Sequence, residues 1–330
     1  MKRILTGDRP TGKLHLGHYI GSLRSRLKLQ KDYEMFLLVA DLHALTTNTD
    51  TSKTQQNVKD LVLDQLSVGI DSEKVTFCVQ SRIPEDAELA TILSMFVSKS
   101  RLERVPTLKD MLRDLKIKNP SLGLLSYPVL QAADILMVGA DLVPVGKDQA
   151  SHVEITREIA QKFNSTYKRE ILNIPEALIP TDLGVLPGID GKMKMSKSLG
   201  NAIFLSDDER TVAEKVMKMF TDPTRIHPTD PGNIEGNPVF IYLDAFAPSR
   251  DKSQVASYKE KYKKGKVGDV EVKQFLVQVL NNFLDPIRKR KADLEKRGGL
   301  VEKILDRGTE KTRKEAQRTL EQVKKTMNLV

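Results

Sequence analysis

The chain has 330 residues, of which 39% are hydrophobic and 29% are charged, and it contains no tryptophan. This composition excludes collagen-like, low-complexity and globally disordered proteins, and the length suggests about two domains. The single cysteine, Cys78, excludes an internal disulfide and a cysteine-built zinc site, which fits a reducing compartment. No apolar run approaches the roughly 18 residues that span a bilayer, and the first residues turn polar too early for a signal peptide. We therefore expect a cytoplasmic protein with no membrane partner.

The net charge of +9 is confined to the end of the chain. Residues 251–330 contain 21 lysines and arginines against 12 acidic residues, whereas residues 1–250 contain 32 of each sign. A concentrated basic segment favours a polyanion such as nucleic acid as a partner. A lysine-rich helical face in solvent explains the charge alone equally well.

Apolar strands alternate with helical patterns in the first half of the chain. We expect strands at 3–7, 35–40, 75–79 and 142–145, and helices at 17–31, 51–68, 85–98, 123–138 and 150–164. This alternation predicts an α/β fold with a doubly wound, Rossmann-like parallel sheet, whose functional loops follow the carboxyl ends of the strands. Later helical patterns at 207–220, 268–298 and 308–327 predict an α-helical C-terminal domain. We therefore expect a catalytic domain over residues 1–203 and a helical domain over residues 204–330.

A glycine-rich turn follows the first expected strand. Residues 7–13 match the G-x-x-x-x-G-K pattern of a P-loop, but Leu14 lacks the hydroxyl that would bind magnesium, so we reject a P-loop. His15, Gly17 and His18 then stand at a predicted helix start, where backbone N–H groups favour anions. Gly17 allows a nucleotide to approach the backbone, and the imidazoles can donate hydrogen bonds to phosphate. Two polar residues at a helix start, without any chemistry, explain this tetrapeptide equally well.

A second segment, residues 191–201, is bounded by glycines and rich in lysine and serine. Such a loop can close over polyphosphate, because lysine supplies point charges and serine supplies hydroxyl hydrogen bonds. Taken alone, a solvated basic linker is the simpler explanation of this segment.

The two segments together are more specific than either one. They read His15-Leu16-Gly17-His18 and Lys194-Met195-Ser196-Lys197-Ser198, and they resemble the HIGH and KMSKS signatures of class I aminoacyl-tRNA synthetases. From Ile4 to the C-terminus, the chain resembles the bacterial tryptophanyl-tRNA synthetases. The stretches that carry this resemblance are PTG at 10–12, DLHA at 41–44, SYP at 126–128, AADIL at 132–136 and VPVGKDQ at 143–149.

The tyrosyl enzymes are the nearest alternative. A pocket for indole needs a flat apolar slot and one acceptor for the ring N–H, and Asp134 occupies the position that carries this role in the family. Tyrosyl enzymes typically add a tyrosine on the first strand, where this chain has Leu5, and this difference favours tryptophan. The chain resembles a divergent or auxiliary branch, because the family often has methionine where Gln131 stands, phenylalanine where Leu5 stands, and T-I-G-N as the first motif. Glutamine at position 131 is also found in tyrosyl enzymes.

The resemblance implies an enzyme that activates L-tryptophan with ATP and transfers it to the 3′ end of tRNA(Trp). The implied catalytic residues are His15, His18, Lys194 and Lys197. The implied ATP-binding residues are Arg9, Pro10, Thr11, Gly17, His18, Gly146, Lys147, Asp148, Val185, Lys194, Met195, Ser196, Lys197 and Ser198. The implied tryptophan-binding residues are Leu5, Gly7, His43, Tyr127, Gln131 and Asp134.

The resemblance also implies magnesium carried on ATP without a protein metal site, a homodimer with helices near 85–138 at its interface, and basic C-terminal helices over residues 204–330 that bind the tRNA backbone and anticodon. Two other classes of function stay open. A nucleotidyltransferase of the same superfamily would act on a small molecule and would not need the basic helices. A catalytically silent RNA-binding paralogue would not need intact catalytic histidines and lysines. The polar tips of His43 and Tyr127 could instead be packed near strand ends, and Asp134 could be one half of a structural ion pair.

Overall fold

The computed structural model describes residues 1–114, 116–146, 149–179, 184–191, 194–227 and 229–329. Its sheet contains five parallel strands in the order β3-β2-β1-β4-β5. The strands are β1 (Arg3–Asp8), β2 (Glu34–Val39), β3 (Val75–Val79), β4 (Leu142–Pro144) and β5 (Glu176–Leu178). The doubly wound α/β fold is confirmed, and β5 is an addition to the expected strands. No helix within the described ranges is long and apolar enough to cross a membrane.

The strand β2 is apolar from Met35 to Val39 because both faces of the sheet are covered. In β2, Met35 and Leu37 face one hydrophobic core, and Phe36 and Leu38 face the other. The first core includes the run of α1 (Leu16–His18), a π-helical turn η1 (Tyr19–Leu23) and α2 (Arg24–Leu29), together with α4 (Thr54–Ser67). The second core is built on α5 (Pro84–Leu93), α8 (Leu122–Met137) and α9 (Ala150–Tyr167). The short helices α3 (Asp41–Ala44), α6 (Lys99–Leu102) and α7 (Pro106–Asp114) connect these elements.

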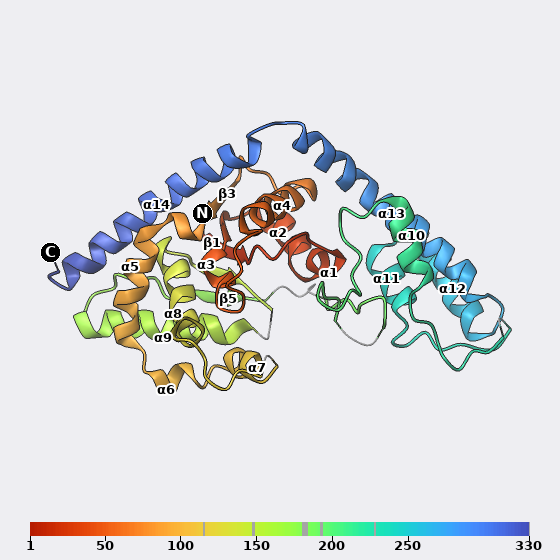
Figure 1. Ribbon diagram of the computed structural model, residues 1–330, viewed down its shortest axis with the longest axis horizontal. Helices are drawn as coiled ribbons and strands as arrows, with labels where there is room; N and C mark the ends of the chain where they lie inside the picture. The colour runs from red at the N-terminus through yellow and green to blue at the C-terminus, as the bar shows by residue number, and fades with distance from the viewer. Residues whose placement is uncertain (115, 147–148, 180–183, 192–193, 228, 330) are drawn as a thin grey trace.

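The remainder of the described chain is largely helical, as expected. It contains α10 (Glu209–Met217), α11 (Pro238–Phe246), α12 (Lys252–Lys263), α13 (Asp269–Glu295) and α14 (Leu300–Thr326). The helices α10 to α13 form a lobe beside the sheet, and α14 then returns across the molecule (Figure 1). The sequence pattern missed α11 because six of its nine residues are buried, so it lacks a polar face. It missed α12 for the opposite reason, since only Val255 and Tyr262 of that helix are buried.

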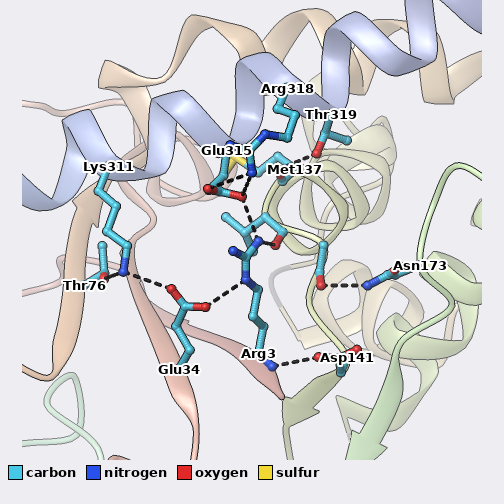
Figure 2. A network of polar contacts seen from close by, with 12 residues as sticks. Arg3, Glu34, Thr76, Met137, Asp141, Asn173, Lys311, Glu315, Arg318 and Thr319 are labelled. Carbon is cyan, nitrogen blue, oxygen red and sulfur yellow. Dashed lines mark hydrogen bonds and ion pairs between the residues drawn. The ribbon is translucent and has the colours of Figure 1, made fainter. Parts of the chain in front are cut away.

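The C-terminal helix α14 closes the β3 edge of the sheet. Thr309 Oγ1 accepts a hydrogen bond from the Val79 N–H at 3.1 Å, so an edge amide finds its partner on this helix. Figure 2 shows charged contacts where the strands begin: Arg3 donates to Glu34 at 2.9 Å and to Glu315 of α14 at 2.8 Å. The division of the chain into domains at residue 203 stays a prediction. The helix α14 belongs to the expected second domain, but it packs on strand β3 of the expected first domain.

Gly308 is the point of closest approach between α14 and β3, and its replacement tests this docking. A Cβ atom at position 308 would lie 1.9 Å from the carbonyl oxygen of Phe77, so the helix would have to move. We expect Gly308→Ala to lower the free energy of unfolding by about 1–3 kcal/mol, as overpacking typically does. Urea titration measures this loss. The matched control is Gly298→Ala, because no atom lies within 4 Å of its added Cβ. Equal midpoints for the two variants would contradict the docking.

Candidate active site

A cavity of about 1020 Å³ opens at the carboxyl ends of β1, β2 and β4. The strand order reverses between β1 and β4, and a doubly wound sheet binds its ligands at such a switch point. Ten of the predicted site residues line this cavity: Leu5, Gly7, Arg9, Thr11, His18, His43, Tyr127, Gln131, Asp134 and Gly146. The structure therefore brings the predicted tryptophan-binding set and part of the predicted ATP-binding set to one place.

The two histidines of the first motif lie against each other at the start of α1. The backbone N–H of His15 donates to Nδ1 of His18 at 3.2 Å, and the ring centroids are 3.8 Å apart. His18 lines the cavity, whereas His15 is buried beside the ring of Phe204. Gly17 is required between them because a Cβ atom there would lie 3.0 Å from the His15 ring and 3.3 Å from Cβ of Met195.

Both imidazoles are neutral at pH 7. Burial, together with the nearby charges of Lys197 and Lys194, lowers the pKa of His15 to about 3 and that of His18 to about 4. Because Nδ1 of the neutral His18 accepts from the His15 backbone, His18 can present its Nε2–H to an anion, and the positive charge of the site comes from the lysines.

The lysine loop, residues 194–201, reaches the glycine-rich turn, residues 7–14. The Lys197 ammonium donates to the carbonyl oxygen of Gly12 at 2.9 Å and to the hydroxyl of Thr11 at 3.2 Å. Sδ of Met195 lies 3.3 Å from the backbone N–H of Gly17, at the start of α1. Burial lowers the pKa of Lys197, while the carboxylates of Asp64 and Asp8 oppose that shift. The two signature segments are thus in direct contact.

A short backbone pairing holds the two segments together. The Leu16 N–H donates to the carbonyl oxygen of Ile203 at 2.9 Å, and the Leu205 N–H donates to the carbonyl oxygen of Leu14 at 3.0 Å. Within the loop, the Ser196 N–H donates to Oδ1 of Asn201 at 2.8 Å. The chain that follows the lysine loop is therefore fixed to the chain that precedes the histidines.

Two carboxylates that the sequence analysis missed support the glycine-rich turn. Asp64 of α4 is fully buried and accepts the Leu14 N–H and the Lys291 ammonium, each at 2.7 Å. Asp8 is paired with the Arg26 guanidinium; burial alone would raise the pKa of Asp8, but Arg26 outweighs it and holds that pKa below its ordinary value. Both could have been found from sequence: Asp8 ends a strand, and Asp64 interrupts an apolar helical run.

The base of the cavity holds a hydrogen-bonded chain of three buried polar side chains. Gln80, which follows β3, accepts the His43 backbone N–H at Oε1, and this bond fixes the orientation of its amide. Its Nε2 then lies 2.8 Å from Nδ1 of His43 and 2.8 Å from Oδ1 of Asp134. His43 Nδ1 is therefore an acceptor, and its Nε2–H faces the carbonyl oxygen of Tyr127 at 3.3 Å. Burial lowers the pKa of His43, which keeps this ring neutral.

A second cluster of polar side chains surrounds the Tyr127 hydroxyl. That oxygen lies 2.8 Å from Nε2 of His152 and 3.3 Å from the hydroxyl of Thr107, and all three residues line the cavity. Burial raises the pKa of Tyr127, so its phenol stays protonated. The sequence analysis missed His152 and Thr107, because no local pattern connects α7 with the first turn of α9.

Other predicted residues lie outside the cavity lining. Pro10 belongs to the glycine-rich turn, which borders the cavity through Arg9 and Thr11. The two signature segments contain the others, and His18 brings the first of them to the cavity: His15, Gly17, Lys194, Met195, Ser196, Lys197 and Ser198. Val185 is 70% exposed and is absent from the lining. Lys147 and Asp148 lie outside the described residues. Across the ranges that the structure describes, no group of three or more histidine, cysteine or acidic side chains could hold a metal ion.

A family model for class I tRNA synthetases, of the tryptophan and tyrosine group, matches residues 1–285. The chain belongs to this family. Curated relatives named tryptophan–tRNA ligase are similar to this chain in sequence over nearly their full lengths. The protein from Treponema pallidum is 51% identical, with 100% of this chain and 97% of that protein covered, and the one from Streptococcus mutans is 49% identical, with 99% and 98% covered.

Solved structures agree with this membership. A tryptophanyl-tRNA synthetase from Campylobacter jejuni, complexed with ADP and tryptophan, superposes with a TM-score of 0.87 at 36% identity and covers 99% of this chain and 100% of its own. The synthetase from Mycoplasma pneumoniae has a TM-score of 0.82 at 27% identity, with 100% of this chain and 98% of that one covered. The family resemblance drawn from the two signature motifs is confirmed.

Proposed function

We propose that this chain is an aminoacyl-tRNA ligase that activates L-tryptophan with ATP and transfers it to the 3′ end of tRNA(Trp). One observation carries the chemistry: Lys197 and the histidine pair lie on the two sides of the glycine-rich turn, beside a cavity that ends at a buried carboxyl group. Relatives about half identical over their full length carry the corresponding name. No observation favours a small-molecule transferase or a silent paralogue over this function.

The first step is attack of the tryptophan carboxylate on the α-phosphorus of ATP, which releases pyrophosphate and leaves tryptophanyl-adenylate. Such a reaction needs positioning and charge stabilisation more than covalent help from the protein. We assign charge stabilisation to Lys197 and Lys194, and N–H donation to phosphate oxygens to His18. The backbone N–H of His15 donates to Nδ1 of His18, and this bond fixes the His18 ring. Magnesium arrives on ATP in this scheme.

We assign recognition of the indole N–H to the Asp134 carboxyl, which lines the cavity and accepts from Gln80. His43 and Gln131 lie along the same cavity, and Leu5 supplies part of its apolar wall. A site that hydrogen-bonds one polar atom of its substrate strongly rejects analogues that lack it, by a factor of about 10⁴–10⁵. Aspartate at this position therefore selects tryptophan over phenylalanine.

We assign tRNA contact to the lobe of α10 to α13 rather than to α14. Many cations of α14 are already paired with acidic residues of the first part of the chain, including Lys311 with Glu34 and Arg313 with Glu85. By contrast, several lysines at the end of α12 and in the turn after it are exposed to solvent, among them Lys261, Lys264 and Lys266. We also retain the expectations of a homodimer and of a cytoplasmic location.

Amino-acid-dependent exchange of labelled pyrophosphate into ATP tests the activity. We expect exchange with tryptophan alone among the twenty amino acids, because Asp134 accepts the indole N–H and Leu5 stands where tyrosyl enzymes bind the substrate hydroxyl. Exchange with tyrosine instead would mean that the pocket is specific for tyrosine, and exchange with none would overturn the proposal.

The role of Lys197 in charge stabilisation has its own test, since Lys197→Ala should slow exchange about 10²–10³-fold. The exposed Lys218 offers the matched control, Lys218→Ala, which should leave the rate unchanged.

Charge reversal in the turn after α12 tests the tRNA surface. We expect Lys264→Glu with Lys266→Glu to weaken tRNA(Trp) binding roughly tenfold at low salt, and to reduce the slope of log Kd against log salt by about 1–2, because phosphate contacts release counterions. Filter binding over a salt series measures both. Lys162→Glu with Arg169→Glu reverses two exposed charges at the end of α9 and serves as the control. Equal losses in the two variants would refute a specific surface on α12.

A further inference from the structure

Gln80 links the polar side chains at the base of the cavity without lining the cavity itself. It follows β3, and its side chain is 0% exposed. Its carbonyl oxygen Oε1 accepts the His43 backbone N–H at 3.2 Å. Its amide nitrogen carries two hydrogens, one directed to Nδ1 of His43 and one to Oδ1 of Asp134, each at 2.8 Å. The amide therefore spends both hydrogens on residues that line the cavity.

The amide of Gln80 fits this place in one orientation. A backbone N–H can only donate, so the atom that faces the His43 N–H must be the carbonyl oxygen. The reversed amide would set its N–H groups against this donor and its oxygen against Oδ1 of Asp134. Buried polar groups that lose their partners are costly, so the surroundings hold the amide as it stands.

A second contact fixes the turn that carries Gln80. Oδ1 of Asp41, the first residue of α3, accepts the Ser81 N–H at 2.9 Å, and Oδ2 of Asp41 accepts the Ser81 hydroxyl. The helix α3 also carries His43. The turn after β3 is therefore held against the helix after β2, and the position of Gln80 beside His43 does not depend on their side chains alone.

Gln80 acts on Asp134 in two ways. Its bond to Oδ1 fixes the direction of the carboxyl group. The other oxygen, Oδ2, lies 3.6 Å from Nδ1 of His43, and this nitrogen accepts from Gln80, so neither residue donates to Oδ2. Burial raises the pKa of Asp134 well above its ordinary value and the charge of Asp86 raises it further, whereas the Gln80 hydrogen bond opposes both. The amide thus favours a carboxylate that keeps one oxygen for a donor entering the cavity.

We infer that Gln80 is a positioning residue for amino-acid selectivity, which turns Asp134 so that one carboxyl oxygen meets the N–H donor of an indole ring in the cavity. This inference rests on the proposed function and extends it to a residue that does not touch the substrate. Selectivity then belongs to the pair of Gln80 and Asp134 rather than to Asp134 alone. A substrate with the shape of tryptophan but without the ring N–H gains nothing from Gln80, so removal of the amide harms only substrates that donate.

An analogue that differs from tryptophan only at the ring nitrogen tests the inference. β-(Benzothiophen-3-yl)alanine carries sulfur in place of the indole N–H, and its Ki as a competitor of tryptophan can be measured in pyrophosphate exchange. Gln80→Met has a similar length but lacks the amide. We expect it to raise the KM for tryptophan roughly ten- to a hundredfold with little change in kcat, and to leave the Ki of the analogue almost unchanged. Equal rises in KM and Ki would overturn the inference, because a general disturbance of the pocket weakens both ligands alike.

Gln65→Met is the matched control. Gln65 is also 0% exposed, and its amide donates to a different carboxylate, that of Asp8, at 2.9 Å. We expect this variant to keep the wild-type ratio of Ki for the analogue to KM for tryptophan, whatever it does to the rate.

A second variant at the same position covers the case in which Gln80→Met does not fold. Gln80→Asn keeps the amide but is one methylene shorter, so it cannot reach His43 and Asp134 together. The ratio of Ki for the analogue to KM for tryptophan should therefore fall in this variant too. A wild-type ratio in Gln80→Asn would contradict the inference.

Nitrogen NMR of protein labelled with ¹⁵N-histidine separates this inference from the proposed function, because it needs no substrate. The signal of His43, one of five histidines, is the one that His43→Gln removes. We expect a neutral ring with its hydrogen on Nε2, since Nδ1 accepts from Gln80. A hydrogen on Nδ1 would overturn the assigned orientation of Gln80 and the inference, while exchange with tryptophan would still support the activity. The expected tautomer without exchange for any amino acid would overturn the proposed function, and the inference with it.

Discussion

The site depends on a backbone pairing of only two hydrogen bonds, between residues 14–16 and residues 203–205. Nearly two hundred residues separate these strands in the sequence, and the histidines and the lysine loop extend from them. Without this pairing the Lys197 ammonium would not reach Gly12, and the cavity would lack its positive rim. The buried Asp64 also holds residue 14 in place, since it accepts hydrogen bonds from the Leu14 N–H and from the ammonium of Lys291 on α13. The helical lobe and the catalytic turn therefore share one buried ion pair.

Charge has two separate uses in the C-terminal part of the chain. On α14 it docks a long helix along the edge of the sheet, through pairs such as Lys311 with Glu34 and Arg307 with Glu73. On α12 and the turn after it, the lysines are exposed to solvent. Net charge alone does not distinguish these uses, because the same residue types serve both. The site itself is different again, since burial keeps its histidines neutral and leaves positive charge only on the lysines.

The sheet and the signature segments could be predicted from the sequence because their causes are local. A strand such as 35–40 is apolar throughout because it is covered on both faces. Gly17 has no side chain because a Cβ atom there would press against the His15 ring and Met195. The rest depends on tertiary contacts. No pattern connects Gln80 with Asp134, because Gln80 follows β3 and Asp134 lies on α8. The sequence analysis likewise began its last helix at residue 308, whereas α14 starts at Leu300 and crosses the sheet edge at Gly308.

The central claim is that the histidine pair and the lysine loop act as one catalytic unit. A double-mutant cycle on the single-turnover rate of adenylate formation tests it most directly, with His18→Ala, Lys197→Ala and the double variant. Residues that stabilise the same charge as a unit give strongly non-additive losses. The account predicts that the double variant is much less impaired than the product of the two single losses. Losses that multiply fully would contradict it and would mean that the two motifs act independently.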